Sequence, residues 1–213
     1  SELILEHAYL LAEASRVIGA AQIQHMGTIG GNLGNASPAG DTLPCLYALD
    51  AEVTLKSLEG ERQLAMSDYM LGVRKTAMQP SELISKVSFD IPQGHAGSAF
   101  NKLGLRRSQA ISIVDVAALL VLDEGRISNV RIALGSVAPT IVRSPSAEKM
   151  LTGQMPSSDL LDRAAEAARK DVSPITDIRG SSVYRLHITK PLVRQALETA
   201  LERARARGQR EDN

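Results

Sequence analysis

The stretch GTIGGNLGN, residues 27–35, places four glycines within eight positions. Glycine adopts positive φ angles readily and lets the backbone come close to a ligand. Successive exposed N–H groups in such a backbone form a nest that can hold an anion such as a pyrophosphate. The wider stretch 22–41, QIQHMGTIGGNLGNASPAGD, is dense in Gly, Asn, Ser and Pro, which predicts an irregular loop rather than a helix or a strand.

Polar side chains in and after this stretch could complete a ligand site. Thr28, Asn32 and Asn35 offer hydrogen bonds, and Asp41 could accept one from a ribose or ribityl hydroxyl. The alternative is a tight structural loop capped by asparagine, and spacing alone favours it because short glycine patterns often occur without a ligand. The stretch matches neither the GxGxxG dinucleotide motif nor the GxxxxGK[ST] phosphate loop.

Hydrophobic periodicity predicts the elements around this loop. Apolar residues recur at helical spacing from Leu3 to Ile18, and Gly19 follows as a helix-terminating residue. After the loop we expect a short helix, a hairpin turning at Glu59-Gly60, and a strand closed by Pro92. Their predicted ranges are residues 43–49, 53–58 with 62–66, and 83–91.

The second half is predicted to begin at a boundary, QGHAGS, residues 93–98. Strands are expected at residues 100–105, 111–122 and 130–137, with a hairpin turn at 123–125. Helices should follow from Ser144-Pro145 to about residue 153 and from Ser158 to about residue 170. A last helix carries apolar residues on one face, and Pro191 should kink it or mark its start. Strands and helices in separate blocks favour an α+β fold.

Composition excludes several classes of protein. The chain has 24 basic and 24 acidic residues, so it lacks the surplus of positive charge that binds nucleic acid. One cysteine excludes a disulfide framework, a cysteine-based zinc site and an iron–sulfur cluster held by this chain alone. No run reaches the roughly 18 apolar residues of a membrane span, and the N-terminus is acidic where a signal peptide would be basic. We therefore expect a cytoplasmic protein that has no metal site of its own and is not embedded in a membrane.

Five segments resemble the FAD-binding (medium) subunits of the molybdenum hydroxylases, the family of xanthine dehydrogenase and carbon monoxide dehydrogenase. The segments are TIGGNLGNASPAGDTLPCLYALDAEVTL, VRKTAMQPSELI, FNKLGLRRSQAISIVDVAA, RIALGSVAPTIVRSPSAEKMLTG and SSVYRLHITKPLVRQAL. The resemblance implies the second lobe of a vanillyl-alcohol-oxidase-type FAD-binding domain over residues 1–92. It further implies a small C-terminal domain of antiparallel strands and helices over residues 98–205, followed by a flexible tail at 206–213.

The resemblance also implies which residues contact the cofactor. Ile84 matches an apolar position beside the flavin, and Lys102 matches a lysine that could stabilise negative charge on it. No residue of this chain needs to act as a nucleophile or general base, so no catalytic residue is assigned. Many family members have arginine where this chain has Gln24. The positions implied to contact FAD are Thr28, Ile29, Gly30, Gly31, Asn32, Asn35, Asp41, Ile84 and Lys102.

By the same resemblance, a partner subunit with two [2Fe–2S] clusters would pass electrons to FAD held here, and FAD would reduce an acceptor such as NAD or oxygen. A second partner with a molybdopterin cofactor would oxidise the substrate. The family subunit begins with another Gly-rich loop that has no counterpart in this sequence. The alternative is therefore a non-catalytic assembly module that has lost autonomous FAD binding. A flavin enzyme of the same fold that acts without such partners is a weaker third hypothesis.

Overall fold

The computed structural model describes residues 1–106 and 108–211. Its first two helices are α1 (Glu2–His7) and α2 (Tyr9–Arg16). The single helix predicted here is interrupted at Ala8, whose φ of −142° and ψ of 50° are not helical. Leu10, Leu11 and Ala14 are buried on one face of α2, as their spacing predicts.

The prediction of an irregular loop at residues 22–41 is wrong. Two short helices occupy this stretch, α3 (Ala21–Met26) and α4 (Ile29–Asn35). Thr28 caps α4, because its hydroxyl accepts a hydrogen bond of 2.9 Å from the N–H of Gly31. A capping hydrogen bond of this kind offsets part of the helix-breaking cost of glycine. Ala36 ends α4 in the left-handed conformation, with φ of 43°.

A three-stranded antiparallel sheet follows α5 (Thr42–Ala48), in the order β2-β1-β5. Its strands are β1 (Glu52–Lys56), β2 (Glu61–Ala65) and β5 (Leu83–Ser88). The hairpin formed by β1 and β2 confirms the prediction, whereas β5 ends three residues before Ile91. Sequence patterns did not predict the elements between β2 and β5. These are α6 (Met66–Tyr69), β3 (Met70–Gly72) and β4 (Lys75–Thr76).

A second antiparallel sheet has the order β6-β7-β8-β9. Its strands are β6 (His95–Gly104), β7 (Ser112–Asp123), β8 (Arg126–Gly135) and β9 (Val142–Arg143). The turn between β7 and β8 lies where it is predicted, and Glu124 and Gly125 both have the positive φ that a tight hairpin requires. β6 begins inside the stretch predicted as a domain boundary, and β9 was not predicted.

The remaining helices are α7 (Pro145–Leu151), α8 (Ser158–Ala168) and α9 (Ser182–Glu211). Ser157, not Ser158, caps α8 by accepting a hydrogen bond from the N–H of Leu160. α9 starts nine residues before Pro191 and continues through it, so Pro191 does not mark its start. α9 also remains helical to Glu211, where a flexible tail was predicted from residue 206. No helix in the described part of the chain is both long enough and apolar enough to cross a membrane.

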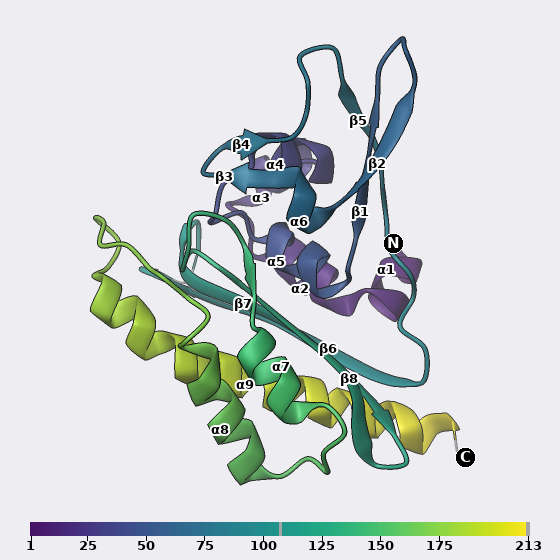
Figure 1. The fold of residues 1–213 in the computed structure, drawn as a ribbon, viewed down its shortest axis with the longest axis vertical. Helices are drawn as coiled ribbons and strands as arrows, with labels where there is room; N and C mark the ends of the chain where they lie inside the picture. The colour runs from purple at the N-terminus through teal and green to yellow at the C-terminus, as the bar shows by residue number, and fades with distance from the viewer. Residues whose placement is uncertain (107, 212–213) are drawn as a thin grey trace.

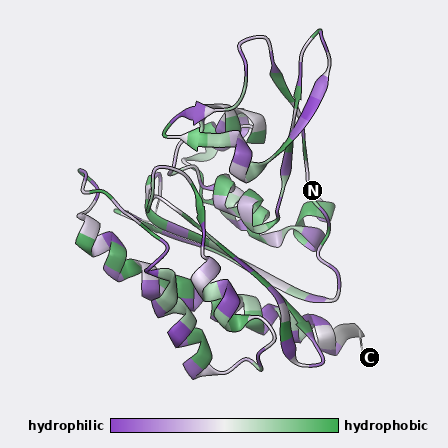
Figure 2. Ribbon diagram, viewed as in Figure 1, coloured by the Kyte–Doolittle hydropathy of each residue, from purple (hydrophilic) through white to green (hydrophobic). Residues whose placement is uncertain are grey.

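The second sheet is buried on both faces (Figure 1). Helices α7, α8 and α9 cover one face, and α2 and α5 pack against the other. Val116 and Leu120 of β7 point into the core formed with α7–α9, whereas Ala117 and Leu119 point into the core formed with the N-terminal helices. Hydrophobic and hydrophilic residues alternate along α8 and α9, as expected of helices with one buried face (Figure 2). The mixed architecture confirms the predicted α+β class.

Candidate cofactor-binding site

A cavity of about 810 Å³ lies beside α3 and α4. This volume is within the range of about 300–1,000 Å³ that is usual for ligand pockets. The end of α2, the loop between α4 and α5, and the segment before β7 complete its wall. Its lining residues are Ser15, Arg16, Ile18, Gly19, Ile23, Gln24, Met26, Gly27, Thr28, Ile29, Gly31, Asn32, Asn35, Ser37, Ala39, Gly40, Asp41, Thr42, Arg74, Gln109, Ala110 and Ile111.

Six of the nine predicted contact residues line this cavity: Thr28, Ile29, Gly31, Asn32, Asn35 and Asp41. The other three do not. Gly30 is half-buried on α4, and Ile84 lies on β5 opposite Leu55, where it packs against the N-terminal core. Lys102 lies on β6 and reaches the cavity only through its contact with Asp41. The short helix α4 therefore gathers most of the predicted positions on one wall.

Close packing shapes this wall around Asn32. A Cβ atom at Gly40 would collide with Oδ1 of Asn32 and lie 2.9 Å from the side chain of Leu43. A Cβ at Gly31 would lie 3.0 Å from the Thr28 hydroxyl. Oδ1 of Asn32 is buried and has no hydrogen-bond partner among the described residues. Buried acceptors are normally paired, so a donor from a bound molecule would satisfy this oxygen. The wall thus fits a polar ligand such as FAD.

Asp41 is held firmly at the cavity edge. Its Oδ2 lies 2.6 Å from Nζ of Lys102, and its Oδ1 accepts a hydrogen bond of 2.7 Å from the Ser112 hydroxyl. The ammonium of Lys102 also donates to the carbonyl of Val17, at 3.2 Å. The side chains of Lys102 and Asp41 are only 10% and 8% exposed, so the pair is largely removed from water. Asp41 presents a neutralised carboxylate to the cavity, not a free negative charge.

Sequence reasoning missed two cations of this wall, Arg16 and Arg74. Each side chain lines the cavity, and neither guanidinium forms an ion pair or hydrogen bond within the part of the chain that the structure describes. Because Lys102 neutralises Asp41, these two arginines leave the lining with a net positive charge. Arg74 follows α6 and β3, which were not predicted, so no local pattern could have placed it here. Gln24 donates from its amide to the carbonyls of Arg16 and Ile18.

Two further buried groups, Cys45 and Asp115, lie behind Asp41. Cys45 of α5 is fully buried, and burial together with the nearby carboxylates of Asp115 and Glu13 raises the pKa of its thiol well above the ordinary value. Asp115 of β7 is also fully buried. Burial, assisted by the negative charge of Asp41, raises the pKa of Asp115 to about 8. Both groups are therefore neutral at pH 7.

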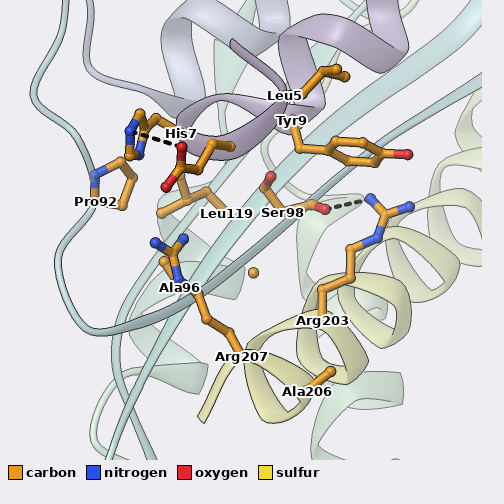
Figure 3. A pocket seen from close by; sticks show the side chains of 12 residues that line it. Leu5, His7, Tyr9, Pro92, Ala96, Ser98, Leu119, Arg203, Ala206 and Arg207 are labelled. Carbon is orange, nitrogen blue, oxygen red and sulfur yellow. Dashed lines mark hydrogen bonds and ion pairs between the residues drawn. The ribbon is translucent and has the colours of Figure 1, made fainter. Parts of the chain in front are cut away.

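A second cavity, of about 600 Å³, lies where α1 and α2 meet β6 and the end of α9 (Figure 3). No predicted contact residue lines it. Arg203, one of the cations that line it, pairs with Glu13, donates to the carbonyl of Ser98 and lies 4.7 Å from the ring centre of Tyr9. These contacts join α2, β6 and α9, which indicates a structural role for this region.

Comparison with known proteins identifies the family. The model of the FAD-binding domain in molybdopterin dehydrogenase matches residues 1–93, and that of the carbon monoxide dehydrogenase flavoprotein C-terminal domain matches residues 98–200. The chain is 35% identical over 207 residues to the 6-hydroxypseudooxynicotine dehydrogenase complex subunit alpha of Paenarthrobacter nicotinovorans. That match covers 96% of this chain and 69% of the relative. The chain belongs to the FAD-binding medium-subunit family of the molybdenum hydroxylases.

Other members of this family agree in sequence and in fold. The chain is also 32% identical to the carbon monoxide dehydrogenase medium chain of Afipia carboxidovorans, over 96% of this chain and 71% of the relative. Its structure matches carbon monoxide dehydrogenase from Hydrogenophaga pseudoflava with a TM-score of 0.91 at 28% identity, covering 95% of this chain and 70% of that one. Quinoline 2-oxidoreductase from Pseudomonas putida 86 matches with a TM-score of 0.88 at 25% identity. The resemblance seen in the five sequence segments is confirmed.

Proposed function

We propose that this chain holds FAD in the cavity beside α4 and serves as the electron-transferring flavoprotein of a molybdenum hydroxylase complex. When bound, FAD would accept electrons from iron–sulfur clusters of one partner subunit and deliver them to an acceptor such as NAD or oxygen. A further partner with a molybdopterin cofactor would oxidise the substrate. The observation that carries the proposal is that six family-implied contact residues line one cavity of suitable size.

The names of the relatives support a multi-subunit enzyme. They include a dehydrogenase complex subunit alpha, a nicotine 6-hydroxylase medium subunit and a carbon monoxide dehydrogenase medium chain. A medium subunit implies larger and smaller partners. One matching structure is described as lacking the Mo-pyranopterin moiety of the molybdenum cofactor, which associates that cofactor with the same kind of complex.

The residues of this chain would bind and orient the cofactor. Asn32 would hydrogen-bond a polar group through Oδ1, which is buried and lacks a partner among the described side chains. Asp41, held by Lys102 and Ser112, would present a fixed acceptor to a hydroxyl group. Arg16 and Arg74 would add positive charge to the part of the wall that meets the phosphates. Lys102 would contribute a buried positive charge one contact behind Asp41.

An absorption spectrum tests the proposal. The chain is purified alone and together with its co-expressed partner subunits, then desalted before and after addition of FAD. We expect flavin absorption that survives desalting, and its reduction by substrate in the assembled complex. The Asn32→Ala variant should retain less FAD, whereas Asn129→Ala, which alters an exposed asparagine on β8, should retain as much as the parent chain. An intact complex without flavin would overturn the proposal and favour the assembly-module hypothesis.

A further inference from the structure

We propose that Asp115 is a positioning residue behind the FAD cavity, a buried proton-carrying carboxyl whose protonation sets the charge around the Asp41–Lys102 pair and thereby the affinity for FAD. The inference rests on the proposed function. Asp115 does not line the cavity, and it can influence a ligand there only through neighbouring residues such as Asp41.

The register of the second sheet places Asp115 next to the ion pair. Asp115 of β7 lies directly opposite Lys102 of β6 and directly opposite Gly135 of β8. All three positions belong to the face that meets the N-terminal helices. Ser112, on the same strand, donates its hydroxyl to Asp41. Asp41 is thus held by two residues, Lys102 and Ser112, that flank Asp115 in the sheet.

The absence of a side chain at Gly135 leaves room for the carboxyl group of Asp115. A Cβ atom at Gly135 would collide with Oδ1 of Asp115 and would lie 3.1 Å from the carbonyl of Pro38. Asp115 itself is 0% exposed, and neither oxygen forms a hydrogen bond of normal geometry with a described residue. An ionised carboxylate in such a place would lose its hydration without compensation. The protonated acid is the form that this position tolerates.

The groups facing Asp115 determine what its ionisation would do. Cys45 lies on α5, and Asp41 immediately precedes that helix. Lys102 lies on β6, and the facing residue of β8 is Gly135, which cannot ionise. Glu13 of α2 is farther away and is paired with Arg203. Burial raises the pKa of Asp115 to about 8, the Asp41 charge also raises it, and Ser112, Lys102 and the Gly135 N–H oppose the rise.

Loss of the proton would place a second negative charge beside Asp41. Lys102 would then have to neutralise two carboxylates, so the Asp41–Lys102–Asp115 group would change from neutral to a net charge of −1. That charge lies directly behind a cavity proposed to hold a diphosphate ligand, and in a site of low dielectric constant the repulsion acts over several ångströms. FAD should therefore bind more weakly above the pH at which Asp115 ionises.

The test measures FAD affinity as a function of pH in the full chain. Dissociation constants for FAD are measured between about pH 6 and pH 9.5 for the parent chain, Asp115→Asn and Asp115→Ala, neither of which can ionise at this position. Asp159→Asn, which removes an exposed carboxylate on α8, is the control. We expect the ratio of the parent Kd to the Asp115→Asn Kd to rise about fivefold or more across this range, and the Asp159→Asn ratio to stay constant.

Infrared difference spectra of the parent chain, recorded without FAD, give an independent readout of the proton. A protonated-carboxyl band should be present at pH 7, decrease as the pH rises through about 8 and be missing in Asp115→Asn. Absence of that band at pH 7, or a Kd ratio that does not change with pH, would overturn the inference even if FAD binds well. Failure of the parent chain to bind FAD at any pH would instead overturn the proposed function and, with it, the link between Asp115 and the ligand.

Discussion

The two faces of the second sheet are both buried, yet they are built differently. On the face toward α7–α9, Val116 of β7 lies opposite Leu134 of β8, and the neighbouring positions are apolar. One residue away, on the face toward α2 and α5, the row Lys102, Asp115 and Gly135 crosses three strands. A core that serves stability alone excludes charge, because an unpaired buried charge costs several kcal/mol. This row, with the buried Lys102 cation and the protonated carboxyl of Asp115, therefore distinguishes the face that borders the cavity beside α4.

The largest effect is expected from breaking the Lys102–Asp41 ion pair on the face toward α2 and α5. Lys102→Ala would leave Asp41 buried without its cation, and removal of one partner of a buried pair typically costs about 3–5 kcal/mol. Urea denaturation at pH 7 measures the free energy of unfolding, and retention of FAD should fall in parallel. The Arg163→Ala variant breaks an exposed ion pair with Asp159 and should cost less than about 1 kcal/mol. Equal losses in the two variants would show that the Lys102 pair has no special place in the fold.

Removing apolar bulk from the opposite face should destabilise the protein without altering ligand affinity. Leu120→Ala deletes a fully buried side chain from the core formed with the C-terminal helices. We expect a loss of about 2–4 kcal/mol in the free energy of unfolding from lost transfer energy and a residual cavity. The Kd for FAD, measured well below the denaturation temperature, should change less than about twofold. A large change in Kd would mean that the two faces are energetically coupled.

Asp115→Asn should stabilise the protein at pH 7, the reverse of most core substitutions. The folded-state pKa of Asp115 is about 8, whereas an unfolded aspartate titrates near pH 4. Between these values the folded chain holds one more proton than the unfolded chain, so stability decreases as pH rises from about 4 to about 8. Asparagine cannot ionise, so the variant does not lose stability in this way, and we expect its free energy of unfolding at pH 7 to exceed that of the parent chain by about 1–3 kcal/mol. Denaturation at pH 4 should show little difference between the two proteins.

The smallest effect on stability is expected at the cavity wall. Asn32→Ala removes an amide whose Oδ1 has no partner among the described residues, so the free energy of unfolding should change by less than about 0.5 kcal/mol. FAD affinity should nevertheless fall about tenfold, because one hydrogen bond to a bound ligand would be lost. Fluorescence titration measures the Kd. Unchanged affinity would remove Asn32 from the proposed contact residues and shift attention to Arg16 and Arg74.

Local patterns determined much of the chain. The hairpin of β1 and β2, the turn at Glu124-Gly125, α5 and the apolar strand β7 lie where alternation and turn residues predict them. The prediction at residues 22–41 was wrong, because glycine content was weighed above the capping hydroxyl of Thr28. The prediction that Pro191 could mark the start of the last helix was also wrong, because α9 packs on β6 and β7 and continues through Pro191. A local capping hydrogen bond outweighed glycine content in the first case, and tertiary packing outweighed local propensity in the second.

By itself, the sequence determined the α+β class through hydrophobic spacing, and its resemblance to a known family indicated that family and six of the residues that line the cavity beside α4. Only the tertiary structure brought Lys102 and Ser112 to Asp41 from more than sixty positions away, and only the strand register placed Asp115 between them. Sequence patterns could not reveal that Asp115 is buried and protonated at pH 7, since an aspartate in an apolar strand can equally be exposed on a sheet face. The charge of a buried group depends on what surrounds it, and those surroundings come from segments that are distant in the chain.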